Sequence, residues 1–241
     1  MFVKIVVILL LLIVAASLLG RGGRAGRGGA GRPAVRVLML RVALVLLALA
    51  AAVALFHFAG KESPAAAAFR ATDVTGAGFG RLAALDGLVD HAGRRVAAAD
   101  FHGKAVVVFF GYTQCPDICP TALATYRDAL RLLGAEAARV QVLFVSVDPE
   151  RDTQEALAGY VPWFDARFLG LRGDAEATRA AAREFRVYYN KVVGDSALGY
   201  GIDHTATSYV IDPAGRIRLL VRDGAPAADI AADLRQLLAG A

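Results

Sequence analysis

A short apolar run that leads directly into two closely spaced cysteines constrains the fold of this chain most. Residues 105–110 read AVVVFF, and residues 111–120 read GYTQCPDICP, which contains both cysteines of the chain. An unbroken run rich in β-branched residues predicts a strand buried on both faces, as in a parallel sheet. Apolar residues at helical spacing then run from Leu123 to Leu133 and end at Gly134. The pattern therefore predicts a strand, a cysteine loop and a helix in direct succession.

This order places Cys115 and Cys119 near the N-terminus of a helix, where the helix dipole lowers the pKa of a thiol. Pro116 and Pro120 fit the same place, because the first residues of a helix do not use their N–H groups within it. Two helix starts remain open. A start near Cys115 puts both sulfurs on one helix face, whereas a start near Pro120 requires a turn to bring them together.

The rest of the C-terminal region alternates between strand and helix patterns. Residues 140–147 (VQVLFVSV) predict a second buried strand, and Asp212-Pro-Ala-Gly215 predicts a type I turn between strands at 208–211 and 217–221. Further segments predict helices at 153–164, 175–185 and 227–238, with a short strand at 187–189. This order predicts an α/β fold: a thioredoxin-like domain over residues 79–241, with a central mixed sheet flanked by helices.

The N-terminal region differs in composition and divides into four segments. The segments are an apolar run at 1–20, an Arg/Gly-rich linker at 21–36, a transmembrane anchor at 37–59 and a spacer at 60–78. Residues 1–60 hold seven of the 27 Lys and Arg residues and no acid, so residues 61–241 carry 20 cations against 22 acids. The basic charge thus belongs to the arm alone, which indicates membrane topology and argues against nucleic-acid binding.

The cationic linker predicts the orientation of the chain in a membrane. The positive-inside rule places residues 21–36 in the cytoplasm, so the domain after the 37–59 anchor faces outward. Met39 also begins a good signal anchor, in which case residues 1–38 are a mis-assigned start. Both interpretations export the domain. Abundant Ala, Gly and Arg favour a bacterial source, so we expect the inner membrane with the domain in the oxidising periplasm.

Two thiols at this spacing have three uses: structural packing or a disulfide, redox chemistry, or metal binding. Thioredoxin-like oxidoreductases place two residues between their cysteines, whereas Cys115 and Cys119 have three between them. Those enzymes also carry a cis-proline before a later strand, where this chain has Ala206. The wider spacing departs from the redox motif without forbidding a disulfide, and Ala206 leaves room for a different group beside the thiols.

A metal site needs a third ligand, and His204 is the best placed of the four histidines. It directly precedes the strand at 208–211, on the sheet edge that faces the active-site loop of a thioredoxin-like fold. His57 falls at the end of the apolar anchor, and His91 and His102 fall in loops that we expect to be solvated. Asp203 is a candidate for orienting His204. Two thiolates and an imidazole suit copper, and zinc accepts the same set. Met1 and Met39 are the only methionines, which excludes a thioether site.

The segment VSVDPERDT, residues 145–153, has a structural interpretation and a functional one. Asp148 ends a strand, Pro149 turns the chain, and Asp152 or Thr153 caps the next helix. We favour this over direct catalysis. Alternatively, the carboxylates help to dock a partner, and Arg151 pairs with a nearby acid.

Three segments together carry a resemblance to a known family: FHGKAVVVFFGYTQCPDICPTAL, VSVDPERDT and DHTATSYVIDPAGRI. From Phe79 to Leu238 the chain resembles the Sco/SenC family of copper chaperones. The resemblance implies a membrane-tethered thioredoxin-like domain that binds copper, as Cu(I), Cu(II) or both, through Cys115, Cys119 and His204. It also implies a role in assembling the CuA centre of cytochrome c oxidase. The implied partners are subunit II of that oxidase or another copper acceptor, and further a periplasmic copper donor or thiol reductant. Gln114, where many members have His, is not among the implied ligands.

Two other expectations complete the sequence analysis. The segment from Lys191 to Asp203 contains three glycines. It predicts a mobile loop that swings His204 onto the metal. The main alternative function is a periplasmic thiol-disulfide reductase in which Cys115 and Cys119 are the redox pair and His204 is incidental. A weaker alternative is a peroxidase-like thiol enzyme, based on Thr113 and Cys115. A metallochaperone would not itself be an enzyme, and the sequence leaves open whether copper transfer or disulfide reduction is the main role.

Overall fold

The computed structural model describes residues 68–193 and 199–240, together with the helical residues 42, 44–49, 51 and 53. The chain divides into two units, and the second, Ala68–Ala241, contains all the strands described below. The segments predicted at 1–20 and 21–36, and most of the anchor at 37–59, lie outside the described residues and stay predictions. Within the described part of the chain, no helix combines the length and the apolar character needed to cross a bilayer.

The described part of the second unit is built on a mixed seven-stranded sheet. Three central strands, β3, β4 and β5, run parallel, and the remaining pairs are antiparallel. Across the sheet the order is β1 (Thr72–Asp73), β9 (Ile217–Val221), β8 (Ser208–Ile211), β3 (Ala105–Gly111), β4 (Val140–Ser146), β5 (Leu169–Arg172) and β2 (Val89–Asp90). This is the predicted thioredoxin-like architecture with a central mixed sheet.

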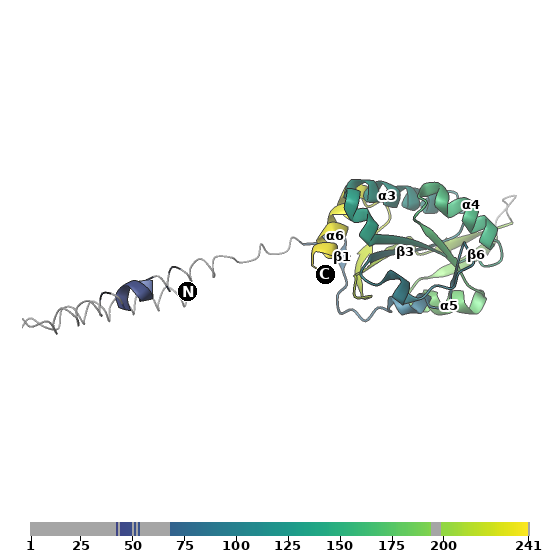
Figure 1. Ribbon diagram of the computed structural model, residues 1–241. Helices are drawn as coiled ribbons and strands as arrows, with labels where there is room; N and C mark the ends of the chain where they lie inside the picture. Colours follow the sequence, from purple (N-terminus) through teal and green to yellow (C-terminus); the bar gives the residue numbers. More distant parts are fainter. Residues whose placement is uncertain are drawn as a thin grey trace, which may run out of the picture. The chain divides into compact units, whose positions relative to one another are not determined.

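Helices cover both faces of the sheet, as Figure 1 shows. On one face lie α3 (Ile118–Leu133), α4 (Gln154–Phe164) and α6 (Ala227–Ala239); on the other lie α5 (Ala175–Glu184) and the short 3-10 helices η1 (Leu82–Leu85) and η2 (Ala98–Phe101), while η3 (Gly134–Arg139) follows α3. Side chains of β3 alternate between the two layers: Val107 and Phe109 pack under α3, and Val108 and Phe110 pack against the α5 side. Burial on both faces explains why this strand reads as an unbroken apolar run.

Most of the predicted elements are confirmed, with two differences that bear on function. The strands at 105–110, 140–147, 208–211 and 217–221 and all four predicted helices are present. The segment predicted as a mobile loop instead forms the hairpin of β6 (Tyr189–Val193) and β7 (Tyr200–His204), apart from residues 194–198, which lie outside the described residues. The strand predicted at 187–189 begins later, at Tyr189. Strand β5 was missed because its four residues, LGLR, include a glycine and an arginine.

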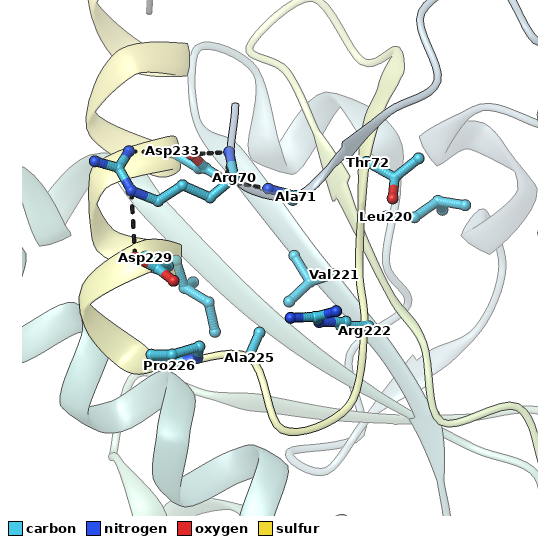
Figure 2. Close-up of a pocket in the computed structure, with 11 residues that line it drawn as sticks. Arg70, Ala71, Thr72, Leu220, Val221, Arg222, Ala225, Pro226, Asp229 and Asp233 are labelled. Carbon is cyan, nitrogen blue, oxygen red and sulfur yellow. Dashed lines mark hydrogen bonds and ion pairs between the residues drawn. The ribbon is translucent and has the colours of Figure 1, made fainter. Parts of the chain in front are cut away.

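The start of the second unit is fastened to its last helix, as Figure 2 shows. The buried carboxylate of Asp233, on α6, accepts hydrogen bonds from the backbone N–H of Arg70 at 2.9 Å and of Ala71 at 2.7 Å. The guanidinium of Arg70 also pairs with Asp229 at 3.2 Å. Residues 70–73 therefore belong to the packed unit, although the sequence assigned them to the 60–78 spacer.

Candidate metal centre

Three side chains converge at the carboxyl end of β3. The ligand atoms of Cys115, Cys119 and His204 all lie within 4.8 Å of one another. The Sγ atom of Cys119 is 3.5 Å from Nε2 of His204, and the backbone N–H of Cys119 points at Sγ of Cys115 at the same distance. Both cysteines are free thiols. The structure thus brings together the three residues that the sequence singled out, in a group that could hold a metal ion.

The junction between β3 and α3 positions the two cysteines. Helix α3 begins at Ile118, between the two starts that the sequence left open, so Cys119 lies in the first turn and Cys115 in the loop before it. Cys119 is fully buried and Cys115 is half-buried. The close fit requires Gly111, because a Cβ atom there would lie 2.7 Å from Sγ of Cys119 and 2.8 Å from the ring of Phe144. One thiol is therefore part of the core and the other faces the opening of the site.

The orientation of His204 leaves one ring nitrogen directed at the thiols. Its Nδ1 lies 3.1 Å from the carbonyl oxygen of Thr205. A carbonyl only accepts, so Nδ1 carries the proton in this hydrogen bond and Nε2 keeps its lone pair, as a metal ligand requires. The rings of Phe109 and Tyr112 each meet the imidazole edge to face, with centroids 5.9 Å away. These contacts hold the ring over the end of β3.

The two thiols differ in acidity. Against the opposing effect of burial, the Cys119 thiol first, then the side chain of His204 and the N–H groups of Asp117 and Cys119, lower the pKa of Cys115 to about 3. The neighbouring Cys115 sulfur and burial raise the pKa of Cys119. In the metal-free protein, Cys115 is thus the thiolate and Cys119 keeps its proton. A thiolate is the form that binds metals and attacks disulfides, so Cys115 is the reactive atom of the pair.

The turn after β4 supports the cysteine loop through a buried carboxylate. Asp152, which has no exposed surface, accepts hydrogen bonds from the backbone N–H of Thr113 at 3.1 Å, from its hydroxyl at 2.6 Å and from the hydroxyl of Ser146 at 2.6 Å. Thr153, rather than Asp152, caps α4 by accepting from the N–H of Ala156. Asp152 therefore fixes the residue two positions before Cys115.

Asp148, at the start of the same turn, is also fully buried and pairs with Arg151, as the sequence predicted for that arginine. The alternative in which these two carboxylates dock a partner is wrong for Asp148 and Asp152, because neither reaches the surface. The sequence contained a hint of this role, since two acids spaced around a turn after a buried strand need internal partners. Their partners, Thr113 and Tyr200, are distant in sequence and could not be identified from it.

The remaining predicted positions lie apart from the metal group. His91 is half-buried, and its Nδ1 accepts a hydrogen bond from the N–H of Gly170 at 3.0 Å, so the expectation of a solvated loop histidine is wrong for it. His102 is exposed, as expected. Asp203 is exposed and is not part of the group. Gln114 accepts from Arg151 at 3.3 Å and likewise does not belong to the group. His57 lies outside the described residues.

The donor set indicates a class of protein. Two sulfur atoms and one imidazole nitrogen suit a soft or borderline metal ion, copper above all. The group is partly open at Cys115, so it fits a site that exchanges its ion more than a closed structural site. A thioredoxin-like domain with such a group is a metal-binding member of that fold.

Comparisons with known proteins place the chain more closely. Residues 87–239 match the SCO1/SenC family, so the chain belongs to that family. It is 45% identical to the mitochondrial SCO2 homolog of Bos taurus over 130 residues, which are 53% of this chain and 49% of that protein. The match thus spans about half the length of this relative and of the human SCO2 homolog.

Two solved structures have the same fold. The structure of Bradyrhizobium japonicum ScoI with copper bound is 36% identical, with a TM-score of 0.58, and the match covers 66% of this chain and 98% of that one. The structure of Arabidopsis thaliana ScoI with copper bound is 30% identical, with a TM-score of 0.59, over 66% of this chain and 99% of that one. Each match covers nearly all of the solved chain and about two thirds of this one.

Proposed function

We propose that this protein is a copper chaperone that carries one copper ion on Cys115, Cys119 and His204. The observation that carries the proposal is the convergence of these three ligand atoms within 4.8 Å of one another, with Nε2 of His204 directed at the thiols. The solved relatives with copper bound support copper as the ion. The ion is cargo: the protein holds it and passes it on.

The half-buried position of Cys115 suits transfer. An acceptor can approach Cys115 first and replace the ligands one at a time, while Cys119 still holds the ion from the core side. Both sulfurs must be reduced for this, so a disulfide between them would prevent loading. The acceptor we propose, on the strength of the family, is the CuA centre of cytochrome c oxidase subunit II.

We further propose that the domain works outside the cytoplasm, held at the bacterial inner membrane by the apolar segment at 37–59. The apolar run, the Arg/Gly-rich linker and the acidic balance of residues 61–241 support this placement. Fusion of alkaline phosphatase after residue 60 tests this placement, because the enzyme is active only when it is exported. We expect an active fusion. An inactive alkaline phosphatase fusion, together with an active cytoplasmic reporter fused at the same position, would contradict the proposal.

An anaerobic Cu(I) titration of the reduced protein against a chromophoric chelator tests the metal function. The wild type is expected to take up one copper ion tightly, and His204→Ala to lose affinity by about a hundredfold or more, since losing a residue that only orients a ligand already costs about 10–100-fold. Asp203→Ala is the matched control, because Asp203 is the neighbouring residue, is exposed and lies outside the ligand group. Equal affinity in all three proteins would overturn the role of His204.

The second candidate is a thiol-disulfide reductase, favoured by the low pKa of Cys115. A reductase needs the nucleophilic thiolate and a resolving thiol, both of which are present. The same proteins separate the two functions. If copper binding is negligible and His204→Ala reduces a model disulfide as fast as the wild type, the reductase is correct and the chaperone is not.

A further inference from the structure

The hairpin that carries His204 is not joined to the central sheet by backbone pairing. Within the described residues, β6 and β7 form a two-stranded sheet of their own. Besides the short link through residues 205–207 to β8, the position of His204 relative to the cysteines depends on side-chain contacts between the hairpin and the rest of the domain. Such contacts come from the turn after β4 and from the rings of Phe109 and Tyr112.

Arg151 is at the centre of these contacts. Its guanidinium lies 3.6 Å from the ring centre of Tyr200 on β7, and its Nη1 donates to the carbonyl oxygen of Tyr200 at 2.9 Å. The same nitrogen donates to Oε1 of Gln114, the residue before Cys115, at 3.3 Å. One side chain thus contacts both segments that carry metal ligands.

A buried acid fixes Arg151 in place. Asp148 has no exposed surface and pairs with Nε of Arg151, whose side chain is only 15% exposed. The other oxygen of Asp148 accepts a hydrogen bond from the hydroxyl of Tyr200 at 2.8 Å. The carboxylate therefore holds the arginine and the strand at once. An arginine with a planar fork of donors and a face for stacking can make all these contacts together.

Two weaker contacts extend the same interface. The hydroxyl of Tyr112 accepts from the backbone N–H of Ile202 at 3.3 Å, and Lys191 of β6 pairs with Glu150 at 2.6 Å. Both Glu150 and Lys191 have largely exposed side chains, so their ion pair adds little. Arg151, Asp148 and Tyr200 form the buried part of the connection.

We propose that Arg151 is a positioning residue for the metal site: with Asp148 and Tyr200 it forms a latch that holds the β6–β7 hairpin against the cysteine loop and so keeps Nε2 of His204 beside the thiols. The latch does not touch the ion. Its effect on copper passes through His204, and in that respect it rests on the proposed function. Its effect on the position of His204 exists in the metal-free protein as well.

The test uses Arg151→Gln in the full chain, with Arg172→Gln as the matched control. Arg172 donates to the carbonyl oxygens of Asp152 and Pro149 at 3.0 and 3.3 Å, so it holds the same turn. Among the described residues it makes no hydrogen bond to the hairpin or to the cysteine loop. A loss that comes from general weakening of the turn is expected in both variants, whereas loss of the latch is expected in Arg151→Gln alone.

The first measurement is NMR of the reduced, metal-free protein. The ring protons of His204 lie beside two aromatic rings, so their shifts depend on where the hairpin sits. In Arg151→Gln we expect these shifts to move toward those of a free histidine and the contacts to Phe109 to weaken, with Arg172→Gln unchanged. Unchanged His204 shifts in Arg151→Gln would overturn the proposal.

The second measurement is a double-mutant cycle on Cu(I) affinity. Arg151→Gln is expected to lower affinity about tenfold, within the range known for residues that orient a ligand. In a His204→Ala background the same substitution is expected to have no further effect, because the latch acts through His204. Equal losses in both backgrounds would overturn it. If the wild type binds no copper, the proposed function fails and the NMR result alone decides the latch.

Tyr200→Phe provides a second variant in case Arg151→Gln does not fold. It keeps the ring on which Arg151 stacks and removes only the hydroxyl that binds Asp148. The expected change in the His204 shifts has the same direction as in Arg151→Gln and a smaller size. If Arg151→Gln does not fold, shifts in Tyr200→Phe identical to those of the wild type would overturn the proposal.

Discussion

Nε2 of His204 lies 3.5 Å from Sγ of Cys119, although 85 positions separate the two residues in the chain. The contact joins the first turn of α3 to the last residue of β7. Helix α3 packs on the central sheet, whereas β7 belongs to a separate hairpin, so the metal group joins the central sheet to that hairpin. The position of the third ligand therefore depends on how the hairpin packs against the sheet, whereas both thiols lie at the single junction of β3 and α3.

The first prediction concerns thiol reactivity in the reduced, metal-free protein. Because hydrogen bonds from Cys119 lower the pKa of Cys115 to about 3, Cys115 is already a thiolate at any pH well above that value. Its alkylation rate is expected to stay flat between about pH 5 and 8, whereas an ordinary thiol with a pKa of about 8.5 speeds up throughout that range. Iodoacetamide labelling followed by mass spectrometry at each site measures this rate. Cys119, buried and protonated, is expected to react far more slowly.

Cys119→Ala is the informative variant for this prediction. It removes the strongest hydrogen-bond donor to Cys115, so the pKa of Cys115 should rise and its labelling should become pH-dependent. A flat profile in both proteins would show that His204 and the N–H groups at the start of the helix, and not the second thiol, determine the acidity of Cys115.

The second prediction concerns Gly111→Ala. The added methyl group would lie within 3 Å of both Sγ of Cys119 and the ring of Phe144, so the thiol or the ring must shift. Overpacking of this kind costs about 1–3 kcal/mol of unfolding free energy, and displacement of Cys119 should also weaken copper binding. Urea denaturation and the Cu(I) titration measure the two effects.

Gly159→Ala is the matched control for that substitution. Gly159 lies inside α4 and has no atom within 4 Å of the position of an added Cβ. Alanine there should raise the unfolding free energy by up to about 1 kcal/mol, because glycine is the poorer helix former. If Gly111→Ala proves as harmless as Gly159→Ala, the close approach at Cys119 is not a constraint on the site.

The sequence predicted the layers of the fold because its strongest patterns come from complete burial. The runs at 105–110 and 140–147 are apolar throughout since both faces of β3 and β4 are covered, and periodicity alone identified the helices that cover them. Short or half-exposed elements were harder to predict. All of β6 beyond Tyr189 is exposed, and β7 contains Gly201, so the hairpin carries little apolar alternation and was interpreted as a loop.

The ligands could be predicted and their support could not, for a physical reason. Cysteine and histidine can be recognised as metal ligands from their residue type. The roles of Asp152 and Arg151 depend instead on distant partners: Thr113 lies 39 positions from Asp152, and Tyr200 lies 49 positions from Arg151. The turn pattern of residues 148–153 explained those side chains locally, as a turn and a cap. Only the packing of β3 beside β4 shows that the same turn lies under the cysteine loop.

The third prediction tests that support through Asp152→Asn. In the wild type, the carboxylate oxygens accept hydrogen bonds from Thr113 and Ser146. In the variant, the NH₂ group of asparagine faces some of these donors and cannot accept, so we expect a loss of about 1–3 kcal/mol in unfolding free energy.

Burial raises the pKa of the Asp152 carboxyl. A carboxyl with a raised pKa takes up a proton more readily in the folded state, so its contribution to stability is greatest at low pH and is lost as pH rises through the folded pKa. The difference between wild type and variant, measured by urea denaturation, should therefore narrow from about pH 4 upward. A difference that widens with pH would contradict this assignment.

The fourth prediction concerns the fastening of residues 70–71 to α6, drawn in Figure 2. Asp233→Ala removes the carboxylate that accepts hydrogen bonds from the backbone N–H groups of Arg70 and Ala71. The loss should lower the unfolding free energy by about 1–3 kcal/mol and speed amide exchange at Ala71. Trypsin should also cut after Arg70 sooner, because the freed segment fits the protease more easily.

Asp229→Ala is the control for this prediction. It removes only a half-exposed ion pair with the same arginine, so we expect the unfolding free energy to change by less than about 1 kcal/mol. Equal exchange and cleavage rates in the two variants would mean that the arginine side chain, and not the buried carboxylate, fastens the start of the domain. Copper affinity should be the same in both, since this contact lies on α6 and no ligand of the metal group comes from that helix.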